Sequence, residues 1–198
     1  MNELIAQTVY YAAPGAANTD RTLHLVAERA RALGIRTVLI ATTSGETGAR
    51  AAELLVGLDV VAVTHSAGFQ EPYAFTYDPA NIVRIKAAGA RVLTTTHAFG
   101  GVGRAVRKKL NTYQVDEIMA FTLRTFGQGM KVAAEITLMA SDGGVLPDGS
   151  PIIAVAGSGH GADTAVVLKP THAQTFFDLR FLEIICMVAP GHPGMDGV

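Results

Sequence analysis

The sequence predicts an α/β fold in which helices cover both faces of a mostly parallel sheet. Short β-branched runs alternate with helical segments along the chain, as in crossover connections between parallel strands. Hydrophobic residues make up 49% of the 198 residues and charged residues only 17%, which suits one sizeable core. No internal repeat and no linker divides the sequence, so residues 1–198 are predicted to form a single domain.

The first half of the chain contains four predicted strands, at Thr8–Ala12, Thr37–Ala41, Asp59–Thr64 and Arg91–Thr95. We expect Asn18 or Thr19 to cap the first helix, whose apolar side chains keep a 3.6-residue period as far as Leu33. Gly34 follows at a position that favours a left-handed C-cap. A second helix is predicted from about residue 46 to residue 56.

The third predicted helix has the clearest start signal in the sequence. Asp78 is a good N-cap, and Pro79 suits the first helical position. The helix is expected to end near Gly89. A glycine-bearing loop is predicted over residues 96–103, and the basic residues between 104 and 109 are expected on the solvated face of a helix.

The second half begins with a mainly helical stretch over residues 116–140. A break is expected at Gly127-Gln128-Gly129, because two glycines within three residues weaken a helix interior. Glycines and prolines predict turns at 142–144 and 147–149. Strands at Ile152–Ala156, Thr164–Leu168 and Arg180–Ala189 complete the pattern. The Gly- and Pro-rich residues 190–198 are expected to form a frayed tail.

Charge and composition exclude several classes of partner. The formal net charge is −1, the pI is about 6.6, and no basic stripe is visible, so nucleic acid is not an expected partner. No apolar run is long enough to span a bilayer, and the N-terminal residues lack the pattern of a signal peptide. A single cysteine, Cys186, fits a reducing compartment. We therefore expect a cytoplasmic protein.

The loop after the second predicted strand has the composition of a phosphate site. Gly45 allows close approach of a ligand, and the hydroxyls of Thr43, Ser44 and Thr47 are hydrogen-bond donors. A helix is predicted to start at Glu46, and a helix N-terminus attracts phosphate without needing a lysine. The alternative is an ordinary helix start with Ser44 as its cap.

A second glycine-rich loop, Gly157-Ser158-Gly159-His160-Gly161-Ala162-Asp163, lies between two predicted strands. Because no helix follows it, it does not match a dinucleotide fingerprint. Its glycines favour a backbone nest for an anion or close approach of a flat ring. The spacing alone favours the alternative of a tight β-hairpin, although a hairpin needs neither His160 nor Asp163.

His97 stands at a strand end beside Thr96, Gly100 and Gly101, where an imidazole can orient a ligand or move a proton. The alternative is a histidine that bonds a neighbouring loop, and the same two interpretations apply to His65. No metal site is expected, since the sequence has no cysteine pair and no H-E-x-x-H motif.

Several segments resemble a family of small, uncharacterised archaeal and bacterial proteins related in fold to the C-terminal domain of pyruvate kinase. The resemblance covers nearly the whole chain. The segments are Val63-Thr64-His65, Gly68-Phe69, Glu71-Pro72, Thr96-His97-Ala98, Thr122-Leu123-Arg124, Phe126-Gly127-Gln128-Gly129, Lys131-Val132-Ala133, Gly159, Gly161-Ala162-Asp163-Thr164-Ala165, Lys169-Pro170 and Phe176-Phe177-Asp178-Leu179-Arg180.

The resemblance implies a three-layer α/β/α domain with a mostly parallel mixed sheet. In that fold the strand at Thr37–Ala41 lies next to Ile152–Ala156, and Thr164–Leu168 runs antiparallel at one side. The two glycine loops then share one crevice. The resemblance also implies flavin mononucleotide as cofactor, whereas the catalytic barrel of pyruvate kinase is absent and its activity is not implied.

The resemblance and the loops together define the expected site. Residues expected to contact the cofactor are Thr43, Ser44, Gly45, Glu46, Thr47, Thr96, His97, Phe99, Gly101, Gly127, Gln128, Gly157, Ser158, Gly159, Gly161 and Asp163. His97 and Asp163 are the candidate catalytic residues, and the loop at Phe99–Gly101 is expected to face the flavin ring. Two other functions fit the same sequence, a regulatory sensor of a phosphorylated metabolite and a structural protein. A homo-oligomer is expected under all three.

Overall fold

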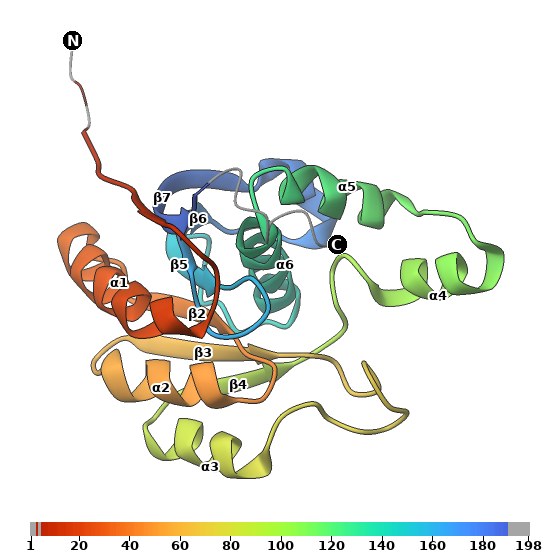
Figure 1. Ribbon diagram of the computed structural model, residues 1–198, viewed down its shortest axis with the longest axis horizontal. Helices are drawn as coiled ribbons and strands as arrows, with labels where there is room; N and C mark the ends of the chain where they lie inside the picture. Colours follow the sequence, from red (N-terminus) through yellow and green to blue (C-terminus); the bar gives the residue numbers. More distant parts are fainter. Residues whose placement is uncertain (1–2, 4, 190–198) are drawn as a thin grey trace.

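A seven-stranded mixed sheet runs through the computed structural model, which describes residue 3 and residues 5–189 (Figure 1). The strand order is β1-β7-β6-β5-β2-β3-β4. The strands are β1 (Val9–Tyr11), β2 (Thr37–Ala41), β3 (Asp59–Thr64), β4 (Arg91–Thr94), β5 (Ile152–Ala156), β6 (Thr164–Lys169) and β7 (Arg180–Val188). The expected frayed tail at 190–198 lies outside the described residues.

The sheet is parallel except at β6, as the fold prediction requires. β2 pairs in parallel with β3 and β5, β3 with β4, and β1 with β7, whereas β6 runs antiparallel to β5 and β7. A short loop without a helix joins β5 to β6, and only antiparallel neighbours can be joined in this way. β6 was expected at one side of the sheet, but β7 and β1 extend the sheet beyond it.

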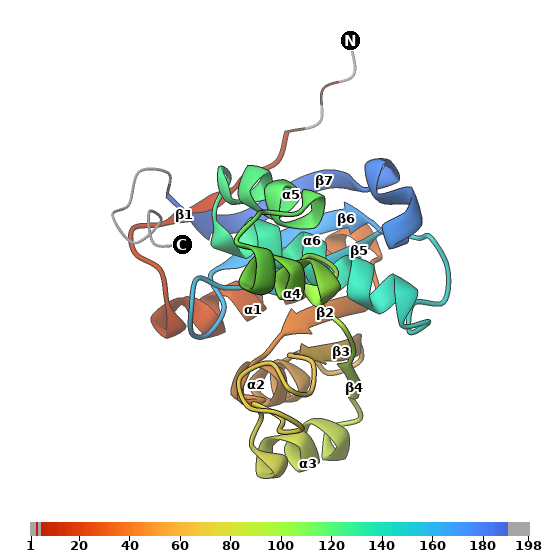
Figure 2. The same ribbon diagram turned by 90° about the vertical axis from the view of Figure 1, so that its right-hand side faces the viewer.

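Helices cover both faces of the sheet (Figures 1 and 2). The helices of the described residues are α1 (Thr19–Leu33), α2 (Glu46–Leu54), α3 (Pro79–Ala87), α4 (Gly101–Leu110), α5 (Val115–Arg124) and α6 (Gln128–Asp142), with short 3-10 helices at Ala16–Asn18 and Ala173–Asp178. α1, α2 and α3 pack on one face and α6 on the other. The three predicted layers are therefore confirmed.

Strand alternation divides the buried side chains of β2 between the two layers. Val38 and Ile40 join the core under α1 and α2, whereas Leu39 joins the core under α6. All three side chains are completely buried, which explains why the strand is apolar throughout. None of the helices in the described part of the chain is long and apolar enough to cross a membrane.

Local signals placed most helix ends correctly. Asp78 accepts a hydrogen bond from the Ala80 backbone N–H at 2.8 Å, and Gly34 is left-handed with φ 68°. The helical stretch after residue 115 breaks before Gln128, as predicted. The cap of α1 differs, because the Asn18 side chain donates to the carbonyl oxygen of Ala13 rather than capping the helix. The predicted loop over 96–103 is also shorter, since α4 begins at residue 101.

Close packing of α6 on β6 predicts the effect of a single methyl group. A Cβ at Gly129 would overlap the Thr164 side chain at the start of β6. Gly129→Ala should therefore lower the free energy of unfolding by about 1–3 kcal/mol, as overpacked core positions do. Urea unfolding monitored by circular dichroism measures this change.

Gly149→Ala is the matched control, because a Cβ there would meet no atom within 4 Å. Its effect should stay within about 0.5 kcal/mol. Equal stability of the two variants would contradict the packing described for α6.

Candidate functional site

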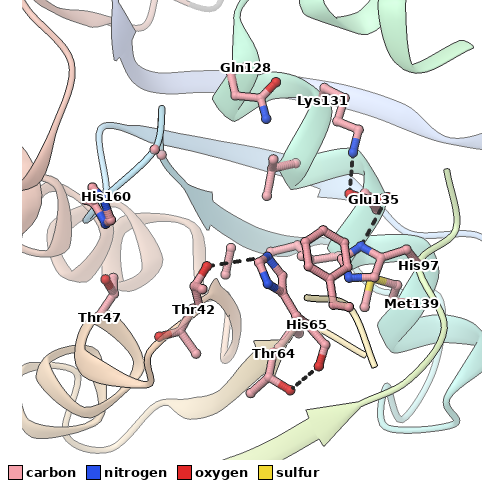
Figure 3. Close-up of a pocket in the computed structure, with 18 of the residues that line it drawn as sticks. Thr42, Thr47, Thr64, His65, His97, Gln128, Lys131, Glu135, Met139 and His160 are labelled. Atoms are coloured by element: carbon pink, nitrogen blue, oxygen red, sulfur yellow. Dashed lines mark hydrogen bonds and ion pairs between the residues drawn. The ribbon is translucent and has the colours of Figure 1, made fainter. Parts of the chain in front are cut away.

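A cavity of about 310 Å³ opens at the carboxyl ends of β2, β3 and β5 (Figure 3). Loops after these strands form one wall, and α6 forms the other. The lining side chains and backbone come from Ala41, Thr42, Thr43, Ser44, Thr47, Val63, Thr64, His65, Phe69, His97, Arg104, Arg124, Gln128, Lys131, Val132, Glu135, Ile136, Met139, Gly157, Gly159, His160 and Gly161. This is the edge at which ligands bind in open α/β sheets.

The loop between β2 and α2 is held against α3. Gly45 is left-handed with φ 89°, and a Cβ there would lie 2.7 Å from the Cβ of Asn81. The carbonyl oxygen of Ser44 accepts hydrogen bonds from the Asp78 backbone N–H at 2.9 Å and from Asn81 Nδ2 at 3.1 Å. Inside the loop, Thr42 Oγ1 accepts from the Gly48 N–H at 3.3 Å. These contacts fix the loop before any ligand arrives.

The same loop presents unpaired donors at the start of α2. Ser44 Oγ accepts weakly from the Glu46 N–H at 3.4 Å, but no acceptor within residues 5–189 takes up the N–H groups of Gly45 and Thr47. The hydroxyls of Thr43, Ser44 and Thr47 line the cavity. Free N–H groups at a helix N-terminus favour an anion, since the helix dipole adds a positive potential there.

The glycine loop between β5 and β6 is organised by Asp163. This residue is completely buried, and its carboxylate accepts from the Gly15 N–H at 3.1 Å, the Ser158 N–H at 3.0 Å and Thr164 Oγ1 at 2.9 Å. The carboxylate therefore holds the loop from behind and does not line the cavity. Gly161 is left-handed with φ 73°, and a Cβ there would lie 2.5 Å from the Cα of Ala16, so both its backbone conformation and its packing require glycine.

A buried charge network on α6 forms the opposite wall. Glu135 Oε2 accepts from Lys131 Nζ at 2.5 Å, and Glu135 Oε1 lies 3.5 Å from His97 Nδ1 and accepts from the Phe99 N–H at 3.2 Å (Figure 3). The side chains of Lys131 and Glu135 are only 6% and 5% exposed. The network ties α6 to the segment that follows β4.

The electrostatics of the cavity favour an anionic ligand. Burial alone would raise the pKa of the Glu135 carboxyl, but the hydrogen bond from His97 and the charge of Lys131 outweigh it and lower the pKa to about 2. Burial lowers the pKa of Lys131, and the charge and hydrogen bond of Glu135 oppose part of this lowering. Arg104, Arg124 and Lys131 contribute three positive charges to the lining against the one negative charge of Glu135, so these four side chains carry two net positive charges.

His65 lies between the Thr43–Thr47 loop and the network formed by Lys131, Glu135 and His97. Its Nε2 lies 3.4 Å from Thr43 Oγ1, and its Nδ1 is buried without a hydrogen-bond partner in the described chain. The ring centroids of His65 and His97 are 5.3 Å apart. Burial, with a smaller contribution from His97, lowers the pKa of His65 to about 4, so its imidazole is neutral at pH 7.

The structure brings half of the residues expected at the site to the cavity. Those that line it are Thr43, Ser44, Thr47, His97, Gln128, Gly157, Gly159 and Gly161. Those that do not line it are Gly45, Glu46, Thr96, Phe99, Gly101, Gly127, Ser158 and Asp163. The two glycine loops nevertheless share one crevice, as the resemblance implied.

Two of the displaced residues, Glu46 and Phe99, are held away from the cavity by other contacts. Glu46 turns outward to pair with Arg84 at 3.2 Å. Phe99 was expected to face a ring, but it is buried against Phe176, with ring centroids 5.7 Å apart in an edge-on contact. Thr96 and Gly101 border a second cavity of about 220 Å³ beside the first.

Sequence reasoning missed the charged wall of the cavity. Lys131 and Glu135 lie four residues apart in a helix that is otherwise rich in small and apolar residues. An isolated opposite-charge pair on a helix predicted to be buried is a signal of an internal ion pair. Arg124, which bonds Gln128 Oε1 at 2.7 Å, carried no comparable signal.

The neutral state of His65 predicts a pH dependence of stability. Its folded pKa of about 4 lies below the unfolded value of about 6.5, so the unfolded state binds the proton first. Stability should fall as the pH drops from about 6.5 to about 4, by roughly 1–2 kcal/mol for a partly exposed ring. Urea unfolding of the wild type and of His65→Gln across this range isolates the contribution.

The exposed His24 gives the control for this comparison. His24→Gln should keep the wild-type pH dependence, whereas His65→Gln should lose part of it. Identical profiles for the wild type and His65→Gln would contradict a neutral, buried His65.

Comparison with known proteins identifies the family. A solved structure of O-ureido-L-serine synthase is similar at 19% sequence identity and a TM-score of 0.30, over 62% of this chain and 38% of that chain. This chain thus corresponds to well under half of that protein's length, and so low a similarity carries no argument about function. The family model for the pyruvate kinase alpha/beta domain matches residues 20–168, about three quarters of the chain, including both glycine loops. The chain therefore belongs to the pyruvate kinase alpha/beta domain family.

Proposed function

We propose that the cavity binds a small ligand through its phosphate group, and that this ligand is flavin mononucleotide. The observation that carries the proposal is the start of α2, where the N–H group of Thr47 is unpaired among the described residues and three residues with hydroxyl side chains, Thr43, Ser44 and Thr47, line the cavity. A rigid loop with free donors needs no rearrangement to receive a phosphate.

Charge balance supports the same ligand class. A phosphate monoester carries about two negative charges at pH 7. The cavity lining carries two net positive charges from Arg104, Arg124 and Lys131 against Glu135. Because these groups are partly or fully buried, their attraction for an anion is screened less than that of surface charges.

The other lining residues suit a flat, partly apolar group attached to the phosphate. Val132, Ile136 and Met139 form an apolar strip on α6, and the rings of His65 and His97 lie beside it. A volume of about 310 Å³ is at the lower end of the ~300–1,000 Å³ typical of ligand pockets. When bound, a flavin supplies redox chemistry, and the protein supplies position and polarity.

A regulatory sensor of a phosphorylated metabolite is the second candidate. The modest cavity volume favours it, since a sugar phosphate needs less room than a flavin. The phosphate of such a metabolite would bind the same Thr43–Thr47 loop and the same cations, Arg104, Arg124 and Lys131. No site for a flat ring would be needed.

Thermal unfolding with added ligand tests the proposal. Flavin mononucleotide at 100 times its dissociation constant should stabilise the folded protein by about 2.7 kcal/mol, whereas riboflavin, which lacks the phosphate, should have a much smaller effect. Equal stabilisation by both compounds would contradict a phosphate site. Stabilisation by ribose 5-phosphate without any effect of flavin mononucleotide would favour the sensor.

Removal of one cavity cation should weaken phosphate binding. Arg124→Gln keeps a polar side chain but loses a charge that faces the cavity, so affinity for flavin mononucleotide should fall about tenfold, as for a lost charged hydrogen bond. Arg50→Gln is the control, because Arg50 pairs with Asp20 on the surface away from the lining. Isothermal titration calorimetry measures the affinity of each variant for flavin mononucleotide. Equal affinities would contradict a role of Arg124 in phosphate binding.

A further inference from the structure

Phe69 occupies an unusual aromatic environment at the mouth of the cavity. Its ring centroid lies 4.1 Å from that of His65 and 4.8 Å from that of His97, with interplanar angles of 33° and 31°. The guanidinium carbon of Arg104 lies 4.8 Å from the same ring centroid. Two imidazoles and a guanidinium therefore surround one aromatic ring.

Phe69 and its neighbours His97 and Arg104 lie between two cavities. The larger cavity, of about 310 Å³, and the neighbouring one, of about 220 Å³, are both lined by Phe69, His97 and Arg104. Movement of the Phe69 side chain would therefore enlarge the space continuous with the Thr43–Thr47 loop. His65 connects the two regions directly, since it contacts Phe69 on one side and Thr43 on the other.

The segment that carries Phe69 is attached to the rest of the protein by few hydrogen bonds, among them Ser66 N–H to His97 Nε2 at 3.4 Å and Thr76 Oγ1 to the Thr43 carbonyl oxygen at 3.2 Å. It spans residues 65–77, between β3 and α3, and projects beyond the carboxyl end of β3 (Figure 1). Two of its residues, Gly68 and Tyr73, have left-handed backbones with φ of 75° and 62°, and Tyr73 is 97% exposed. The Gly68 N–H bonds the Ala74 carbonyl oxygen within the segment itself. Phe69 lies in no strand or helix, so a change of its side-chain position breaks no hydrogen bond of the sheet or of a helix.

We propose that Phe69 fills, in the free protein, a subsite for the planar heteroaromatic ring of a phosphate-bearing ligand. Imidazole faces and a guanidinium bind any such ring by stacking and cation–π attraction, whether it is a flavin or a nucleobase. The ring would replace Phe69 against His65, His97 and Arg104, while its phosphate binds the Thr43–Thr47 loop. The inference rests on the proposed phosphate site and adds the ring as the second determinant of binding.

Phe69 is then a competitor of the ligand and not a part of the finished site. If Phe69 were instead a fixed wall, its removal would weaken ring binding, because the ring would lose a stacking partner. The two roles predict opposite signs for the same substitution, so one variant distinguishes them.

The experiment compares Phe69→Ala with Phe75→Ala. Phe75 belongs to the same segment and stacks on Tyr77 at 4.8 Å, but it lines neither cavity. Affinities for flavin mononucleotide, riboflavin and ribose 5-phosphate are measured for both variants and the wild type by calorimetry and flavin fluorescence. Thermal unfolding without ligand confirms that each variant is folded.

Phe69→Ala should bind flavin mononucleotide and riboflavin about tenfold more tightly than the wild type, with ribose 5-phosphate affinity unchanged. Phe75→Ala should match the wild type for all three ligands. Weaker or unchanged binding of both flavins by Phe69→Ala would overturn the ring subsite, even if ribose 5-phosphate binds. Tighter riboflavin binding with no response to ribose 5-phosphate would support the ring subsite while the phosphate site fails.

Discussion

The buried carboxylate of Glu135 is the constraint on which the rest of the site depends. A carboxylate that is 5% exposed must be paired and hydrogen-bonded, or its burial would cost several kcal/mol. Lys131, His97 and the Phe99 N–H meet this need. These contacts of Glu135 hold α6 against the segment after β4. They thereby set the width of the cavity and the orientation of the His97 ring.

The sheet topology positions the loops that form the opposite wall of the cavity. β2 and β5 are parallel neighbours, so the loops that follow them emerge at the same edge of the sheet. The chain leaves β5 by a hairpin and not by a crossover helix, which keeps the Gly157–Gly161 backbone close to the start of α2. Asp163 makes this arrangement rigid by binding the loop and the N-terminal Gly15 together. A polar residue that resembled a catalytic group thus has a structural task.

The cavity combines a rigid polar end with a lightly attached aromatic end. Asp78 and Asn81 at the start of α3 hold the Thr43–Thr47 loop, whereas Phe69 lies on a segment with few long-range hydrogen bonds. The rigid loop favours binding of a small ligand, because a preformed anion site reduces the entropy cost of binding. Stacking groups tolerate more variation in position than hydrogen-bond donors do.

Sequence patterns alone determined the α/β class, the seven strands, most helix ends and the two glycine loops, because strand burial, helix capping and turn chemistry are local properties. They could not determine that Phe99 is core while Phe69 faces the cavity, since both are phenylalanines in glycine-bearing loops. They also did not reveal the Lys131–Glu135–His97 network, whose partners come from α6 and from a loop far away in sequence. Tertiary structure decided these points, because burial and pairing depend on which surfaces the sheet topology brings together.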